Sequence, residues 1–123
     1  MKIAFQQSLI EQLHEAGSRS LSPAKVCEFF GFSNQDLADR ARVDRHTVTA
    51  YPQAPQLQKY LKDLVSALAV ATEATGDAKR AAFLLRNEPL RVFGYKTADT
   101  LIQEGRTNAV IAYIESSRAG AAG

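Results

Sequence analysis

The stretch FSNQDLADRARVDRHTVTAY, residues 32–51, decides the fold because it predicts two short helices joined by a tight turn. Ser33 is expected to cap the first helix, since a serine oxygen readily accepts an unpaired N–H of the opening turn. Asp36 then places a carboxylate near the positive end of the helix dipole. Asp44 repeats the capping pattern for a second helix, and Val43 lies between the two, where it can fill their corner. The stretch therefore predicts a helix-turn-helix.

The two predicted helices have different faces. Small and apolar residues line one side of the first helix, and Val48 and Tyr51 are three apart on one face of the second. The exposed face of the second helix carries Arg45, His46 and Thr49, which can all donate or accept hydrogen bonds at base edges. We predict that this helix enters the major groove of DNA, with Arg45 as the candidate for a bidentate guanine contact.

The start of the first helix offers contacts to the DNA backbone. Ser33, Asn34 and Gln35 lie at a helix N-terminus, where polar side chains and backbone N–H groups commonly meet phosphates. The net charge of the chain is only +2, which is too small to steer the whole molecule onto a polyanion. We therefore expect a homodimer that binds operator DNA at half-sites about one helical turn apart.

This stretch resembles the Xre/Cro type of helix-turn-helix. That family combines a polar cap, a Leu-Ala pair, a Val in the turn and a polar recognition helix that ends in an aromatic residue. The chain departs from the pattern at Arg42, where the family usually has Gly, the residue that adopts positive φ freely. Asn34 stands where the family usually has a glutamine near the start of the first helix, and Gln35 follows it.

Composition favours a compact helical protein without a disulfide. The 123 residues are 46% hydrophobic and 23% charged, which fits one domain or two small units. The single cysteine, Cys27, excludes an internal disulfide and a cysteine-based metal cluster, and we expect it to be a buried thiol. Because neither a membrane-spanning stretch nor a signal peptide is evident, we expect a cytoplasmic protein that does not bind membranes.

The remaining helices follow from apolar periodicity and from capping residues. We predict helices over residues 1–16, 22–30, 56–75 and 77–87, a short helix between Thr97 and Gly105, and a last helix from Thr107 or Asn108. The final residues 119–123 are expected to form a mobile tail. The predicted fold is all-α, with an N-terminal helix-turn-helix unit over residues 1–55 and a helical unit over residues 56–123.

The C-terminal half resembles the toxin-binding domain of antitoxins called Xre/MbcA/ParS. That domain has a long helix, a helix that ends before an Asn-Pro-Leu-like break, a Gly-x-x-Thr-Pro segment, a short helix closed by Gly and a final helix. The residues at the corresponding places are Asn87, Pro89, Leu90, Gly94, Thr97, Leu101, Gly105, Val110 and Ile114. Ala98 replaces the usual Pro after Thr97.

The resemblance implies an antitoxin of a type II toxin–antitoxin system that neutralises a RES-domain toxin, an enzyme that destroys NAD, and represses its own operon. An exposed loop of basic and aromatic residues suits a protein interface. The candidate toxin-binding residues are Arg86, Asn87, Arg91, Phe93, Tyr95, Lys96 and, next to the tail, Arg118. The alternative for this loop is that Val92 and Phe93 belong to the core and the charges are merely solvated.

Motifs of catalysis are missing from the sequence. It has no nucleophile motif, no glycine-rich phosphate loop and no metal-ligand spacing, so we expect neither an enzyme nor a cofactor. A stand-alone helix-turn-helix repressor, whose C-terminal unit dimerises, is the main alternative to an antitoxin. A third possibility is an interaction module whose helix-turn-helix has lost DNA binding.

Overall fold

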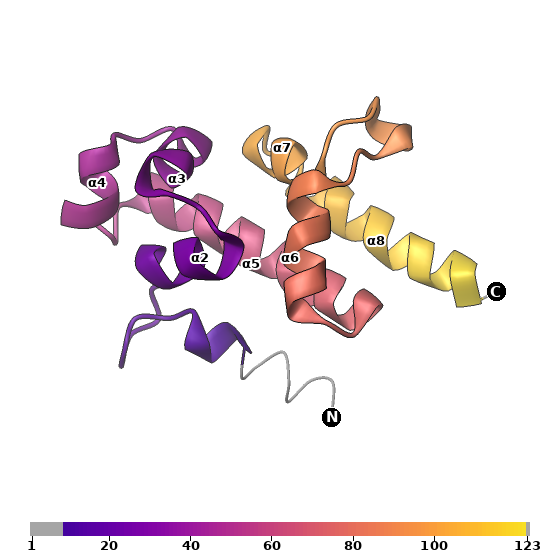
Figure 1. Ribbon diagram of the computed structural model, residues 1–123, viewed down its shortest axis with the longest axis horizontal. Coiled ribbons are helices and arrows are strands. Elements are labelled where there is room, and N and C mark those ends of the chain that lie inside the picture. The colour runs from indigo at the N-terminus through magenta and orange to yellow at the C-terminus, as the bar shows by residue number, and fades with distance from the viewer. Residues whose placement is uncertain (1–8, 123) are drawn as a thin grey trace. The chain divides into compact units, whose positions relative to one another are not determined.

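The structure is a computed structural model that describes residues 9–122, together with the side chains of residues 9–117. It consists of helices joined by short connections (Figure 1). Within residues 9–122 there is no β-strand, and the isolated bridges His14–Leu21 and Leu90–Lys96 are the only β-type pairings. The predicted all-α fold class is confirmed.

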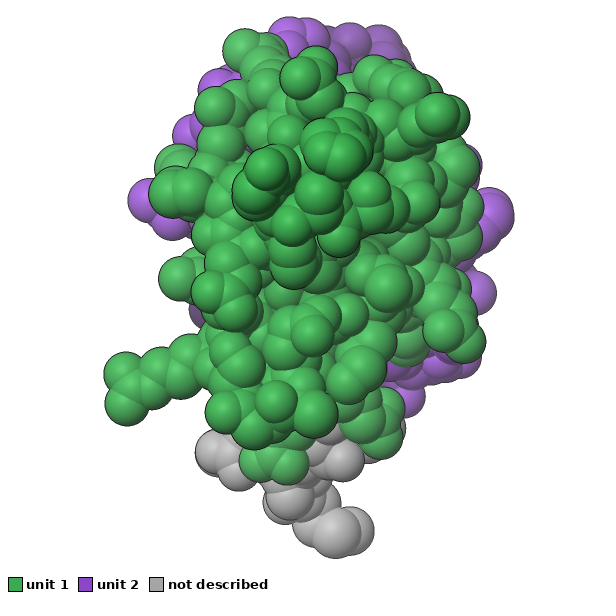
Figure 2. Space-filling view, turned by 90° about the vertical axis from the view of Figure 1, so that its left-hand side faces the viewer, with its two compact units in different colours: residues 1–62 green, residues 63–123 purple. Residues whose placement is uncertain are grey.

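The chain divides into two compact units, Met1–Lys62 and Asp63–Gly123 (Figure 2). The division falls inside the longest helix, α5, which spans Pro55–Thr75. The first turns of α5 therefore belong to unit 1 and the rest belongs to unit 2. Each unit has its own set of fully buried side chains.

Unit 1 is built around three short helices, α2 (Pro23–Phe30), α3 (Asn34–Ala41) and α4 (Arg45–Ala50). Helix α3 packs against both α2 and α4. The apolar residues of these helices and of the first turns of α5 are buried, as burial of apolar surface is the main force that holds such short helices together. The largest fully buried side chains of unit 1 are Leu37, Leu57, Leu61 and Val26.

The first predicted helix is shorter than expected. Residues 1–8, including Ile3, lie outside the described part of the chain, and the described helix covers only residues 9–12 instead of reaching residue 16. The helix ends there because the chain turns back on itself: His14 pairs with Leu21, and the N–H of Ser22 donates to the carbonyl of Leu13 at 2.8 Å. Leu9 and Leu13 are buried.

Unit 2 contains the rest of α5 and the helices α6 (Ala78–Asn87), α7 (Ala98–Gln103) and α8 (Thr107–Ala122). Helix α7 packs against α6 and α8, and the 3-10 turn η1 (Arg91–Phe93) lies between α6 and α7. Asp77 caps α6 by accepting hydrogen bonds from the backbone of Lys79 and Arg80, as predicted from the sequence. Thr97 likewise caps α7, accepting from the backbone N–H of Thr100 at 3.1 Å.

The C-terminal segment was expected to leave the last helix as a tail. Helix α8 instead continues to Ala122, because the alanines of this segment favour a helix strongly. The side chains after Ser117, including the predicted toxin-binding Arg118, lie outside the described side chains, and so does Gly123.

A buried glutamine of α5 connects separate parts of unit 1. The Oε1 atom of Gln58 accepts a hydrogen bond from the N–H of Leu21 at 3.0 Å. Its Nε2 atom donates to the carbonyls of Leu21, at 2.9 Å, and of Pro52, at 2.8 Å. Pro52 lies in the connection between α4 and α5, so this one amide fixes both the entry to α2 and the exit from α4.

We predict that Gln58→Leu lowers the free energy of unfolding by about 2–4 kcal/mol, because the apolar side chain leaves three buried backbone groups without partners. Urea denaturation measures this difference. Gln53→Leu is the matched control: Gln53 is exposed, and the same exchange there should change stability by less than about 0.5 kcal/mol. Equal stability of both variants would contradict the role of Gln58.

Candidate DNA-binding and protein-binding surfaces

The first candidate surface is formed by α3, α4 and the turn between them. A full capping box opens α3: the Oγ of Ser33 accepts from the N–H of Asp36, and Oδ2 of Asp36 accepts from the N–H of Ser33, both at 2.9 Å. Arg42, Val43 and Asp44 form the turn. Val43 is half-buried, and its N–H donates to the carbonyl of Ala38 at 3.0 Å, which ties the turn to the preceding helix.

Arg42 adopts the left-handed conformation for which Xre/Cro sequences usually have glycine. Its φ is 60° and its ψ is 46°, a region that non-glycine residues occupy uncommonly. Gln56 of α5 supports this turn, because its Nε2 donates to the carbonyls of Ala41 at 3.1 Å and of Arg42 at 2.9 Å. The Arg42 carbonyl is thus bonded to α5 while its backbone stays in the left-handed conformation.

The residues predicted to read bases are all at the surface. Arg45, His46 and Thr49 are exposed on α4, and Val48 is buried beneath them. Thr49 donates its hydroxyl to the carbonyl of His46 at 3.2 Å, and the His46 ring meets the Tyr51 ring edge-to-face with centroids 6.0 Å apart. Within the described residues, Arg45 has neither a hydrogen bond nor an ion pair, so its guanidinium is available to a ligand.

Two expectations about α4 are wrong. Asp44 occupies the N-cap position, but its side chain makes no capping hydrogen bond. Tyr51 does not share the buried face of Val48: it lies just beyond the helix, with φ −131° and ψ 64°, and its side chain is 63% exposed. The reason is Pro52, since the residue before a proline is disfavoured in the helical region. Tyr51 is thus an exposed aromatic residue that the sequence pattern missed.

The predicted phosphate contacts lie at the exposed N-terminus of α3. Ser33, Asn34 and Gln35 are all exposed, and the side-chain amide of Gln35 donates to Oδ1 of Asp39 at 2.8 Å. Residues 1–62 contain eight Lys and Arg against six Asp and Glu, whereas residues 63–123 contain seven of each, so the net charge of +2 belongs to unit 1. A polyanion is therefore attracted to unit 1 more than to unit 2.

Arg40 of α3 and Cys27 of α2 make internal contacts that leave them no evident role in binding. The Arg40 guanidinium lies 4.3 Å from the centroid of the Phe32 ring, and Arg40 Nη1 donates to the carbonyl of Asp36 at 3.2 Å. Burial raises the pKa of the Cys27 thiol, and the charge of Asp36 raises it further. Cys27 is therefore a protonated, buried thiol, as expected from the sequence.

The second candidate surface is the loop between α6 and α7. The N–H of Leu90 donates to the carbonyl of Lys96, and the N–H of Tyr95 donates to the carbonyl of Leu90, both at 2.9 Å. Gly94 and Tyr95 both have φ of 68°, which lets the chain reverse within this short segment. The loop is therefore a closed, hydrogen-bonded structure, which the sequence had indicated only as a bend.

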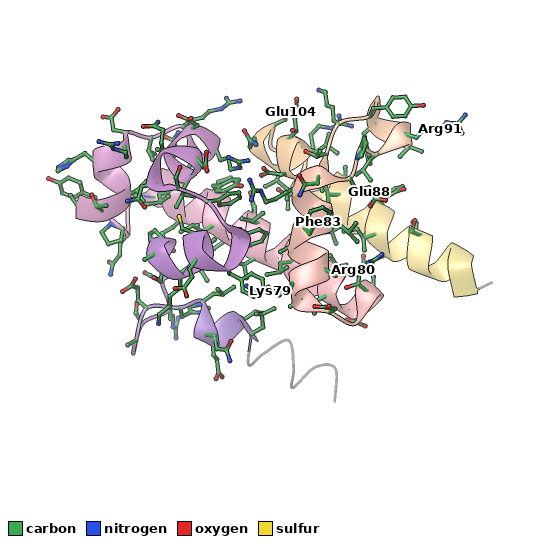
Figure 3. All side chains as sticks on the ribbon, in the orientation of Figure 1. Lys79, Arg80, Phe83, Glu88, Arg91 and Glu104 are labelled. Atoms are coloured by element: carbon green, nitrogen blue, oxygen red, sulfur yellow. The ribbon has the colours of Figure 1, made fainter. Side chains whose placement is uncertain are left out.

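The predicted toxin-binding residues of this loop fall into two groups. Tyr95 and Arg91 are exposed, and Figure 3 shows Arg91 projecting outward from η1. Phe93 is half-buried: its ring meets the Tyr113 ring edge-to-face at 5.7 Å, and the Arg106 guanidinium lies 5.2 Å from its centroid. The alternative that Val92 belongs to the core is wrong, because Val92 is 69% exposed.

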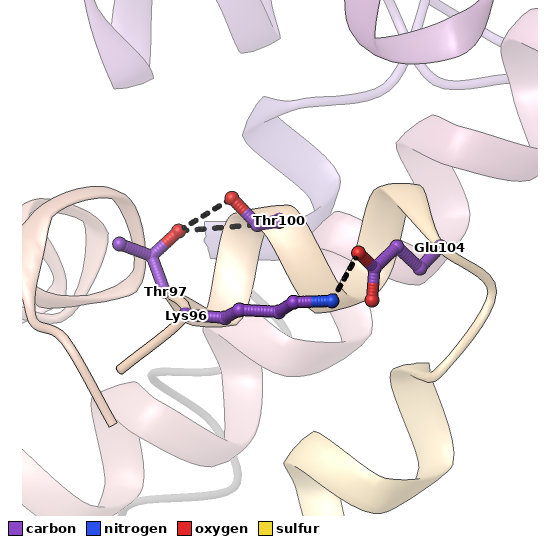
Figure 4. Close-up of polar contacts among 4 residues, drawn as sticks. All are labelled: Lys96, Thr97, Thr100 and Glu104. Carbon is purple, nitrogen blue, oxygen red and sulfur yellow. Dashed lines mark hydrogen bonds and ion pairs between the residues drawn. The ribbon is translucent and has the colours of Figure 1, made fainter. Parts of the chain in front are cut away.

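The other predicted residues make local contacts. Nζ of Lys96 forms an ion pair with Oε2 of Glu104 at 2.7 Å, beside the Thr97 cap of α7 (Figure 4). Asn87 is exposed and donates its side-chain amide to the carbonyl of Phe83 at 2.9 Å, whereas Arg86 is half-buried in the last turn of α6. Lys96 therefore joins the end of the loop to α7, whereas the Asn87 hydrogen bond lies within α6.

Unit 2 also contains an apolar cleft of about 330 Å³. Residues of α5, α6 and α8 line it, and Glu88 is the one charged residue in its lining. Within the described residues no group of His, Cys, Asp and Glu is arranged to hold a metal ion. Among the helices of the same residues, none combines the length and apolarity that a bilayer crossing requires.

No protein-family model, no curated protein and no solved structure matches this chain.

Substitutions of Arg42 test the left-handed conformation of the turn between α3 and α4. We predict that Arg42→Gly raises the free energy of unfolding by about 0.5–1 kcal/mol, since glycine adopts the left-handed conformation without the penalty of a Cβ atom. Arg42→Val should lower it by at least about 1 kcal/mol, because a β-branched residue tolerates positive φ poorly. Thermal unfolding of the variants measures both effects, and the reverse order of stabilities would contradict the observed turn.

Proposed function

We propose that this protein is an antitoxin that binds operator DNA through unit 1 and a RES-type, NAD-destroying toxin through unit 2. The observation that carries the proposal is the exposed face of α4. Arg45, His46 and Thr49 are exposed on this helix, whereas Val48 is buried, and the helix directly follows the turn that Gln56 supports. The resemblance of residues 32–51 to Xre/Cro sequences and of the C-terminal half to Xre/MbcA/ParS sequences supports the same assignment.

The DNA-binding step follows from the chemistry of these side chains. A guanidinium without an internal partner can donate two parallel hydrogen bonds to O6 and N7 of a guanine. His46 and Thr49 lie on the same face and serve as secondary base readers. Ser33, Asn34 and Gln35 position the protein on the phosphates, which fixes the register of α4 in the groove. A homodimer doubles the contacts of this small module.

Toxin binding belongs to the loop between α6 and α7. Exposed aromatic and arginine side chains dominate the energetics of protein interfaces, and Tyr95 and Arg91 are both exposed there. Bound toxin would be neutralised, and the complex would repress its own operon through unit 1. We place the protein in the cytoplasm, where both DNA and NAD are found.

A stand-alone repressor is the second candidate, because it shares every feature of unit 1. In a stand-alone repressor, unit 2 would serve as a dimerisation domain, and the loop between α6 and α7 would not need to bind a different protein. The two candidates differ in one simple respect: an antitoxin has a gene for a RES-type protein next to its own.

We predict that Arg45→Ala loses about 1–3 kcal/mol of binding free energy for operator DNA, because a bidentate base contact disappears. The gel shift of a labelled fragment of the protein's own promoter measures the loss, and circular dichroism checks that the fold is intact. Arg19→Ala is the matched control, since it removes the same charge from an exposed position before α2. Equal affinities of the wild type and of Arg45→Ala would contradict base reading by Arg45.

We also predict that the protein co-purifies with the product of an adjacent RES-type gene when both are expressed together. Size-exclusion chromatography should show one complex that contains both chains, and the toxin in it should not degrade NAD. Separate elution of the two chains would contradict the antitoxin function and favour the stand-alone repressor.

A further inference from the structure

The loop Leu90–Lys96 exposes two large apolar side chains that a folded protein would normally bury. Val92 is 69% exposed and Tyr95 is 66% exposed, although they are only three residues apart in a short, closed loop. Neighbouring exposed apolar side chains with polar surroundings are typical of sites where proteins bind one another. Phe83 of α6 is similarly exposed, at 64%, but lies on a regular helix outside this loop (Figure 3).

Tyr95 is not only exposed but also has a strained backbone conformation. Its φ of 68° places a bulky residue in the left-handed region, which asparagine and glycine occupy far more readily. Within the described residues, the Tyr95 side chain has no hydrogen bond, ion pair or ring contact that would compensate for this strain. Its backbone N–H is bonded to Leu90, so only the side chain is left without a partner. Because backbone strain is concentrated at functional sites, the side chain points to a role in binding rather than in folding.

The contacts beneath the loop hold it in one conformation. The loop is closed by the Leu90–Lys96 and Leu90–Tyr95 hydrogen bonds, and the Lys96–Glu104 ion pair joins its end to the C-terminal end of α7. Phe93 lies between the Tyr113 ring and the Arg106 guanidinium, so it anchors η1 to α8. A loop that is already ordered loses little entropy when it binds, which favours a tight complex.

The charges around the loop indicate the charge of the partner surface that would bind it. Lys96 is balanced by Glu104, whereas Arg91 is exposed and has no ion pair within the described residues. Arg106 adds a second positive charge over Phe93, and Glu88 is the exposed carboxylate that precedes the loop. The charges near the tip are therefore positive on balance, so the complementary surface is acidic.

We infer that the loop Leu90–Lys96 is a preformed anchor that inserts Tyr95 and Val92 into an apolar pocket of the toxin, while Arg91 meets a carboxylate at the rim of that pocket. This inference rests on the proposed function and deepens it. It separates the residues that touch the partner from Phe93 and Lys96, which are positioning residues that hold the loop.

Substitution of Tyr95 tests the inference on the full chain, with the purified product of the adjacent RES-type gene as the binding partner. Tyr95→Gly removes the side chain and relieves the strain, so the melting temperature should stay the same or rise. Its affinity, measured by isothermal titration calorimetry, should fall at least about 30-fold, the loss expected for an interface hot spot. Tyr95→Phe keeps the ring and should bind within about threefold of the wild type.

Two further variants separate the Tyr95 ring from the flexibility of the loop and from exposed rings elsewhere in unit 2. Tyr95→Asn keeps a residue that tolerates positive φ, and it should lose affinity as strongly as Tyr95→Gly; wild-type binding by Tyr95→Asn would show that loop flexibility caused the loss and would overturn the inference. Phe83→Ala removes an equally exposed ring outside the loop and should bind within about twofold of the wild type. An equal loss for Phe83→Ala would also overturn the assignment to the loop.

Failure of the anchor and failure of the antitoxin function give different results. A wild-type chain that binds the toxin while Tyr95→Gly binds equally well overturns the anchor alone and leaves the antitoxin function standing. A wild-type chain that does not bind the toxin removes the antitoxin function and the anchor with it.

Discussion

Unit 1 depends on the requirement that buried backbone groups have hydrogen-bond partners. Gln58 satisfies one N–H and two carbonyls in segments that no regular helix covers. Gln56, which is itself exposed, donates to the carbonyls of Ala41 and Arg42 at the turn. Leaving one buried polar group unpaired lowers the free energy of unfolding by a sizeable fraction of the total for a small domain. Two side chains from one turn of α5 therefore fix where α4 begins and where the chain leaves it, and so determine how Arg45 and Thr49 are presented.

The non-glycine residues that the structure places at positive φ, Arg42 and Tyr95, both belong to candidate binding surfaces. Their surroundings differ. The carbonyl of Arg42 is supported by Gln56, and the turn has a clear structural purpose, namely to change direction between α3 and α4. Tyr95 has glycine beside it in the same conformation, so the chain reversal alone does not explain why a tyrosine is there. The strain at Arg42 therefore follows from the fold, whereas we attribute the strain at Tyr95 to binding.

Local signals in the sequence predicted most helices, but pairings between distant residues could not be read from it. Ser33 caps α3 as predicted, because a cap depends on residues within one turn. The helix starts predicted near Ser22, Asp77 and Thr97 are capped by these residues in the same way. Gln58 is 37 residues from Leu21, and no periodicity indicates such a contact. For the same reason the sequence overextended the first helix, whose end depends on the pairing of His14 with Leu21. The exposed face of Arg45 was predictable from helical spacing, whereas the support of Phe93 by Tyr113 and of Lys96 by Glu104 was not.

The two candidate surfaces differ in the force that would drive binding. Unit 1 carries the whole net charge of the chain and presents a guanidinium and hydrogen-bonding groups, so its association with DNA must release counterions and weaken as salt rises. The loop of unit 2 exposes the apolar side chains of Val92 and Tyr95 together with the single charge of Arg91, so burial of apolar area would dominate there and salt would weaken binding less. A rise in ionic strength would therefore weaken binding at the first surface more than at the second. Under the proposed function, rising salt would release DNA before it releases the toxin, because different forces would hold the two ligands.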